Sequence, residues 1–160
     1  MKKSLTSVIA ILCFLNSSNI CAASSIAENN LAGNYTCTGY DRQDKDLRCK
    51  LTVTLDAKNS LLQNGYGAYK IKMVAPTDMV VKGLPPNIAA TGEIASNGNT
   101  FALSFKNTNP KAPTDYGTGI GTASHVQDKT GVFHTVLHFF SYQSVYKGGD
   151  NSTWTCKKST

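Results

Sequence analysis

The sequence is poor in the side chains that bind phosphate or carry out catalysis. Only two of its 160 residues are arginine, Arg42 and Arg48, although the formal net charge is +6. Planar arginine side chains suit phosphate recognition, and no stretch interleaves arginine with aromatic residues as RNA-binding surfaces do. The scattered lysines therefore indicate ordinary solubility rather than nucleic-acid binding. Because the chain also lacks a Gly-x-Ser-x-Gly elbow and a glutamate pair of the glycosidase kind, we expect a protein that is not an enzyme.

The sequence also lacks an apolar run of the roughly 20 residues that a membrane-spanning helix needs. Its most apolar run, residues 5–15, follows Lys2-Lys3 and precedes the small residues Cys-Ala-Ala at 21–23. That layout is typical of a secretory signal peptide. We expect residues 1–23 to be removed and residues 24–160 to form one domain. The mature protein should then be exported to the bacterial periplasm or beyond the cell, without a stable membrane anchor.

The remainder of the chain reads as short strands separated by turn signals. Residues 49–56 show the pattern best, because Cys49, Leu51, Val53 and Leu55 alternate with polar side chains. We expect about eight antiparallel strands and no helix of any length, hence an all-β fold that is a single up-and-down β-barrel, with a β-sandwich as the alternative. The expected strands cover residues 31–39, 49–56, 68–74, 88–95, 100–106, 116–126, 132–146 and 152–157, with a weaker one at 79–82.

Three cysteines remain after the expected signal peptide, and all lie on the inward phase of their strands: Cys37, Cys49 and Cys156. In an exported protein, three cysteines allow one disulfide and leave one thiol. The first and last strands of a closed barrel are neighbours, which favours a bridge between Cys37 and Cys156. A bridge between Cys37 and Cys49 across the first hairpin, or between Cys49 and Cys156, stays open. We expect the remaining thiol to be a buried small apolar group rather than a nucleophile.

His134 and His138 are the most tempting polar pair. On a helix their spacing could chelate a metal, but the surrounding residues are strand formers. On a strand the two side chains share a face about 13 Å apart, at about 3.3 Å per residue, which is too far for one ion. We therefore expect no metal and no cofactor, and keep both histidines as candidate ligand contacts.

Two hypotheses of function follow. In the first, the protein is a non-catalytic exported binding protein whose barrel interior or mouth takes a small, partly apolar ligand. Its cavity would be lined by Tyr69, Phe101, Phe105 and Trp154. Small barrels often fill their interior with their own side chains instead.

In the second hypothesis the protein is a secreted interaction module, an inhibitor or an effector, that binds a protein partner through its surface. Residues 132–146 carry apolar side chains on both faces of the expected strand, which favours a partner or a covering element there. The loop at 107–115 is another candidate surface. Residues 117, 119 and 121 are glycines on one strand face; they favour either close packing of a large neighbouring side chain or a ligand lying against bare backbone.

Two resemblances are visible. The segment Gly-Asn-Tyr-Thr-Cys-Thr-Gly-Tyr-Asp at 33–41, together with Trp154-Thr155-Cys156, resembles a group of short exported bacterial proteins of unestablished function. The expected architecture resembles the meander β-barrels of the lipocalin and avidin class, in which Gly-x-Trp commonly opens the first strand. Here Gly33-Asn34-Tyr35 stands at that place, and the tryptophan-rich ligand pocket of avidins has no counterpart because the chain holds one tryptophan. The resemblance implies shape and leaves the ligand open.

Overall fold

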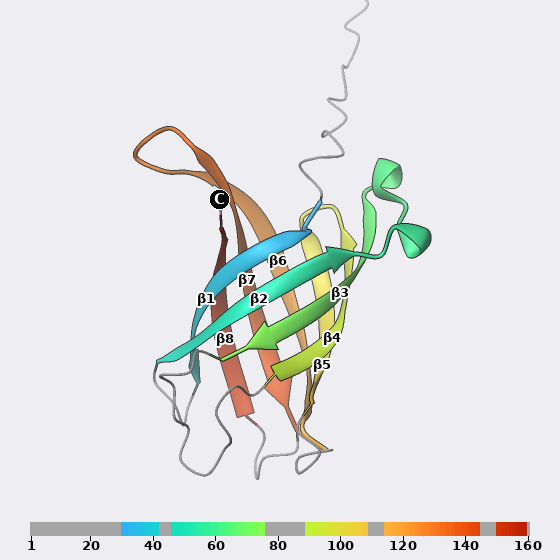
Figure 1. Ribbon diagram of the computed structural model, residues 1–160, viewed down its shortest axis with the longest axis vertical. Coiled ribbons are helices and arrows are strands. Elements are labelled where there is room, and N and C mark those ends of the chain that lie inside the picture. Colours follow the sequence, from blue (N-terminus) through green and yellow to red (C-terminus); the bar gives the residue numbers. More distant parts are fainter. Residues whose placement is uncertain (1–29, 42–45, 76–88, 109–113, 145–149, 160) are drawn as a thin grey trace, which may run out of the picture.

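Eight antiparallel strands close into a barrel in which each strand pairs with its neighbours in sequence and β1 pairs with β8 (Figure 1). The computed structural model describes residues 30–41, 46–75, 89–108, 114–144 and 150–159. The strands are β1 (Gly33–Asp41), β2 (Leu47–Leu55), β3 (Tyr66–Val74), β4 (Ala89–Asn97), β5 (Thr100–Asn107), β6 (Tyr116–Gln127), β7 (Phe133–Gln143) and β8 (Asp150–Lys158). Two single-turn 3-10 helices, η1 (Ala57–Asn59) and η2 (Leu62–Asn64), connect β2 to β3.

The prediction of an all-β, up-and-down barrel is confirmed, and the sandwich alternative is not what the chain adopts. The strand at 132–146 was expected to be longer than β7, which ends at Gln143. The expected signal peptide at 1–23 and the weaker strand at 79–82 lie outside the described residues. No helix in the described part of the chain is long and apolar enough to cross a bilayer.

The barrel interior is filled by its own side chains. Inward-facing residues of all the strands form one core cluster, and Tyr35, Tyr69 and Leu31 are among its most deeply buried members. The Tyr35 hydroxyl donates to the Leu31 carbonyl at 2.6 Å, and the Tyr69 hydroxyl accepts from the Leu31 amide at 3.2 Å. These bonds satisfy the polar groups of two buried rings and fix the segment before β1 across the interior. Burial, and then the nearby Tyr69, raise the pKa of Tyr35 far above its ordinary value.

Cys37 and Cys156 form a disulfide that joins β1 to β8, as predicted. Their Cα atoms are 3.9 Å apart, and the two residues are register partners across the strand pair that closes the barrel. Cys49 is the free thiol and is buried, so the expectation for it is also confirmed. Burial raises the pKa of the Cys49 thiol to about 12, which keeps it in its neutral, unreactive form.

The three glycines of β6 make room for large side chains of β5. A Cβ at Gly117 would lie 2.5 Å from the Phe105 ring, and a Cβ at Gly121 would lie 2.6 Å from the Phe101 ring. At Gly119 a Cβ would lie 2.4 Å from the Phe140 carbonyl oxygen. The first interpretation of the glycine stripe, packing of large neighbouring side chains against bare backbone, is therefore confirmed.

The hairpin of β6 and β7 extends beyond the strands beside it, at the upper left of Figure 1. The β5 register of β6 ends at Thr122 and the β8 register of β7 begins at Val136, so residues 125–127 and 133–135 have register partners only in each other. Phe133 shares its strand phase with the buried Leu137, yet it is 65% exposed because the barrel no longer surrounds it there.

Candidate functional site

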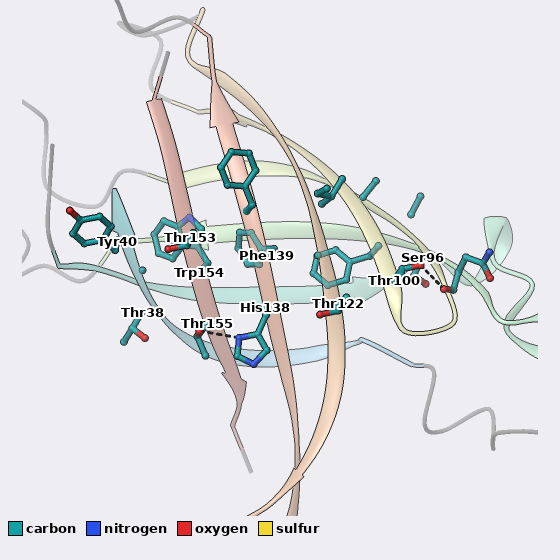
Figure 2. Close-up of a pocket in the computed structure, with 18 of the residues that line it drawn as sticks. Thr38, Tyr40, Ser96, Thr100, Thr122, His138, Phe139, Thr153, Trp154 and Thr155 are labelled. Carbon is teal, nitrogen blue, oxygen red and sulfur yellow. Dashed lines mark hydrogen bonds between the residues drawn. The ribbon is translucent and has the colours of Figure 1, made fainter. Parts of the chain in front are cut away.

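A groove of about 1290 Å³ runs along the barrel wall, perpendicular to the strands. Figure 2 shows its labelled residues as a band that runs from Thr38 and Tyr40, past Trp154 and Phe139, to Thr100 and Ser96. Its lining consists of Asp46 and three adjacent rows of residues. A row takes one residue from each strand that it crosses, and each residue is the register partner of the next one in the row. We call these the polar row, the inner row and the apolar row.

The polar row forms one side of the groove and is dominated by hydroxyl groups. Its members, from β1 through β8, β7, β6, β5 and β4 to β3, are Thr38, Thr155, His138, Thr122, Thr100, Asn97 and Tyr66. All are exposed. The Thr155 hydroxyl and the His138 Nδ1 are 3.1 Å apart, and the Thr100 hydroxyl donates to the Asn97 carbonyl at 2.9 Å. The row therefore presents donors and acceptors at every strand that it crosses.

The apolar row forms the other side. Its members, from β1 to β4, are Tyr40, Thr153, Phe140, Ile120, Ala102 and Ala95. Ile120 is 68% exposed and its cross-strand partner Phe140 is 44% exposed. Large apolar side chains exposed side by side are unusual on a monomer surface and commonly mark a binding site.

The inner row lies between them and supplies the floor. Its members, from β1 to β4, are Gly39, Trp154, Phe139, Gly121, Phe101 and Ser96. Their side chains point into the barrel, where the rings of Phe139 and Trp154 stack with centroids 6.1 Å apart and those of Phe101 and Phe139 meet edge to face at 6.2 Å. These contacts make the floor rigid, because aromatic pairs in these geometries are mutually stabilising.

The groove lies on the outer wall of the barrel. Both flanking rows are exposed, whereas a cavity inside the barrel would also be lined by the next inward side chains on the same strands. Those side chains include Cys37, Leu137 and Cys156, which are fully buried and do not line the groove. The groove thus follows from the alternation of side chains along each strand. The inward-facing side chains fill the core, and the outward-facing side chains form the two sides of the groove.

The groove is almost without charge. Within the described part of the chain, its lining holds one carboxylate, Asp46, and neither lysine nor arginine. The described residues also bring together no group of three histidine, cysteine or acidic side chains that could hold a metal ion. The chemistry available in the groove is therefore mainly hydrogen bonding by neutral groups and apolar contact, with the Asp46 carboxylate as the one acidic group among the described lining residues.

Three of the residues expected to bind a ligand line this groove. Phe101 and Trp154 belong to the inner row, and His138 belongs to the polar row. Phe101 and Trp154 turn their rings into the core, where both rings pack against Phe139.

The other three lie elsewhere. Tyr69 is 1% exposed and contributes to a separate hollow of about 440 Å³, and Phe105 contributes to a third of about 590 Å³. His134 stands on the protruding hairpin, where its Nε2 lies 2.6 Å from Oδ2 of Asp128. The four aromatic residues expected to line one interior cavity are thus distributed over three hollows.

Sequence reasoning did not single out Thr38, Thr122 or Ile120 as site residues. Each lies on the outward phase of a predicted strand, and the alternation was the available signal. The register of β1, β8, β7 and β6 brings these residues into one site. Alternation along a single strand does not predict that register.

Comparisons with known proteins bear on the fold. No protein-family model matches the chain, and no curated protein matches it. Among solved structures it is similar to a redesigned β-barrel, with a TM-score of 0.54 and 14% sequence identity over 89% of this chain and 100% of the other. At that identity the likeness concerns the barrel fold alone.

Proposed function

We propose that this protein is a non-catalytic, exported binding protein that takes a small, partly apolar ligand in the outer groove. The observation that carries the proposal is the groove itself, in which an exposed apolar row and an exposed polar row face each other across a rigid floor. Such a combination of apolar contact area with a few convergent polar groups is typical of ligand sites.

The location differs from the interior or mouth cavity that the sequence favoured. Tyr35, Tyr69, Leu103 and Phe101 occupy the interior, so a ligand there would have to displace packed side chains. Groups in the outer groove are already exposed and can bind without such a rearrangement. The groove is therefore the better candidate for the same kind of ligand.

The proposal that the protein is not an enzyme draws on the setting of His138. Its Nδ1 is paired with the Thr155 hydroxyl rather than with a carboxylate of the kind that orients the histidine of a catalytic triad. In that setting His138 serves as a hydrogen-bonding contact for a ligand.

Two features support the proposal that the protein is exported. Residues 1–23 have the layout of a signal peptide. Cys37 and Cys156 form a disulfide, and disulfides persist in oxidising compartments.

The binding of Nile red, a small neutral apolar dye, tests the proposal. The wild-type protein should enhance the dye's fluorescence saturably, and Phe140→Ser should weaken binding roughly tenfold, equivalent to about 1.4 kcal/mol of apolar contact. Phe133→Ser is the matched control, because Phe133 is an exposed phenylalanine of the same strand that does not line the groove. Binding that is absent in the wild type, or that Phe133→Ser weakens as much as Phe140→Ser, would overturn the proposal.

A secreted protein-interaction module is a second candidate, favoured by the apolar tip of the protruding hairpin. Val126, Val132 and Phe133 are all exposed there. Native mass spectrometry of protein purified from its own host separates the two candidates: a retained small molecule supports the first, and a stoichiometric protein partner that is lost in Phe133→Ser supports the second.

A further inference from the structure

We infer that the ligand of the outer groove is a neutral oligosaccharide, lying extended across the strands from β1 toward β4. This inference rests on the proposed function and names the chemical class of the ligand. It is carried by the division of the groove into one hydroxyl-rich side and one apolar side, and by the absence of basic residues among the described residues that line it.

The polar row offers two free threonine hydroxyl groups, on β1 and β6, which lie three strand spacings apart. Within the described part of the chain, the hydroxyls of Thr38 and Thr122 hydrogen-bond to no other side chain, and both residues are exposed. Figure 2 shows them on either side of the His138–Thr155 pair. A threonine hydroxyl both donates and accepts, as does each hydroxyl of a sugar. The strands stand about 4.8 Å apart, close to the repeat of a chain of β-linked pyranose rings, so that successive rings can meet successive strands.

The apolar row matches the other chemical property of a sugar ring, its C–H face. Phe140 and Ile120 give adjacent apolar surface opposite the polar row, and the side chains then shrink to Ala102 and Ala95. A ring seated between the rows can set its C–H groups against Phe140 and Ile120 while its hydroxyls turn toward Thr122 and Thr155. A purely apolar ligand would leave the threonine hydroxyls of the polar row without a partner.

The charge and shape of the groove argue against the other common ligands. Nucleotides, phospholipid headgroups and acidic sugars need cations, and the described lining provides none. An extended peptide commonly binds by adding a strand to a sheet edge, but the strands that the groove crosses are paired with their neighbours in the closed barrel. The lining is also spread along a row of strands, which suits an extended ligand.

Titration of the isotope-labelled full-length mature protein with neutral hexasaccharides, followed by two-dimensional amide NMR, tests the inference. The probes are cellohexaose, chitohexaose and maltohexaose, with glucose and N-acetylglucosamine as single-ring comparisons. We expect at least one hexasaccharide to shift the amides of Gly121 and Phe139 saturably, with a dissociation constant near or below about 1 mM. The matching single ring should bind at least tenfold more weakly, because it meets fewer strands.

The variant Thr38→Val/Thr122→Val removes two hydroxyls while keeping the β-branched shape, and it should weaken hexasaccharide binding about tenfold. Thr54→Val, an exposed threonine of β2 outside the groove, is the matched control and should bind the hexasaccharide and Nile red normally.

The outcomes separate the two claims. If Nile red binds in the groove but no hexasaccharide does, or if the double variant binds hexasaccharide as well as the control does, the oligosaccharide assignment is wrong while the proposed function stands. If neither probe binds, both fail. A hexasaccharide that shifts amides only at the protruding hairpin would overturn the assignment of the groove.

Discussion

Cys37 of β1 stands directly opposite Cys156 of β8, and the disulfide between them joins the first strand of the barrel to the last. The same residue is the register partner of Cys49 on β2, so three cysteines lie in one row across three adjacent strands. A bridge from Cys37 to Cys156 and a bridge from Cys37 to Cys49, the two that the sequence left open for Cys37, are thus both compatible with the register. The bridge that forms is the one that secures the closure of the barrel.

Removal of the bridge should destabilise the fold strongly. It spans 119 residues, and in the chain-entropy model a loop of that length stabilises by roughly 4–5 kcal/mol, with measured values commonly lower. We expect Cys37→Ser/Cys156→Ser to lower the free energy of unfolding by about 3–5 kcal/mol in urea denaturation. Cys49→Ala, which leaves the bridge intact, is the control. An unchanged urea midpoint in the double variant would show that β1 and β8 hold together without the covalent link.

The buried thiol of Cys49 should make stability depend on alkaline pH. Its pKa is raised from 9.0 to about 12 by burial, so above pH 9 the unfolded chain ionises this thiol while the folded chain does not. The contribution is therefore fully present below pH 9 and is lost as the pH rises from there toward about 12. Between pH 8 and pH 10 the wild type should lose about 1.4 kcal/mol more than Cys49→Ala, measured by urea denaturation.

The comparison of the wild type with Cys49→Ala should be made no higher than pH 10. At higher pH the raised pKa of Tyr35 also lowers the free energy of unfolding. In the same window the folded wild type should react with Ellman's reagent far more slowly than the unfolded chain does. Equal pH dependence in the wild type and in Cys49→Ala, or rapid reaction of the folded thiol, would contradict burial of Cys49.

The strands and the closure of the barrel could be predicted because they depend on local alternation. In β2, the inward side chains Cys49, Leu51 and Val53 alternate with exposed polar residues, and the first and last strands carry inward cysteines that can meet only if those strands adjoin. The alternation is visible in neighbouring residues, and the two inward cysteines indicate the closure without any knowledge of the strands between them.

The outer groove could not be predicted in the same way, because it depends on which outward residues of seven strands share a row. Thr38 and Thr122 are 84 positions apart in sequence, and they join one row only through the registers of β1 with β8, β8 with β7 and β7 with β6. A shift of one residue in any of these pairs would turn half of the row inward. Phe133 was equally unpredictable, since its exposure reflects where β5 and β8 stop.

Gly121 should be intolerant of any side chain. A Cβ there would lie 2.4 Å from the His138 carbonyl oxygen and 2.6 Å from the Phe101 ring, so Gly121→Val must displace the wall or the core. Overpacking of this kind commonly costs about 1–3 kcal/mol, which should appear as a lower midpoint of thermal unfolding. Gly98→Asn is the control, because Gly98 has open space around it and a φ of +56° that asparagine tolerates. If Gly121→Val unfolds at the wild-type temperature, the close packing of Phe101 against β6 is wrong.

Asp128 should order the tip of the protruding hairpin without supporting the barrel. Its Oδ1 accepts from the amides of Thr130 and Val132 at 2.8 and 3.1 Å, and its Oδ2 lies 2.6 Å from the His134 ring. In Asp128→Ala we expect the Thr130 and Val132 amides to exchange with solvent at least fivefold faster, with no change in the exchange of core amides, as measured by NMR. Thr130→Val, which removes the hydroxyl bond to Asp128 but leaves the carboxylate, is the control and should have a smaller effect on Val132.

The same contacts give the tip a dependence on acid pH. The hydrogen bond from the Thr130 hydroxyl, followed by the contact with His134, lowers the pKa of Asp128 well below its ordinary value of 3.8. A depressed carboxyl pKa means that the ordering is present above pH 3.8 and is lost as the pH falls from there toward the folded value. The Thr130 and Val132 amide resonances should therefore show no transition centred near pH 3.8, where an ordinary aspartate titrates, and the transition of Asp128 should appear only at lower pH. A transition of these two amides centred near pH 4 would contradict the contacts, because it would show a carboxyl group that the turn does not hold.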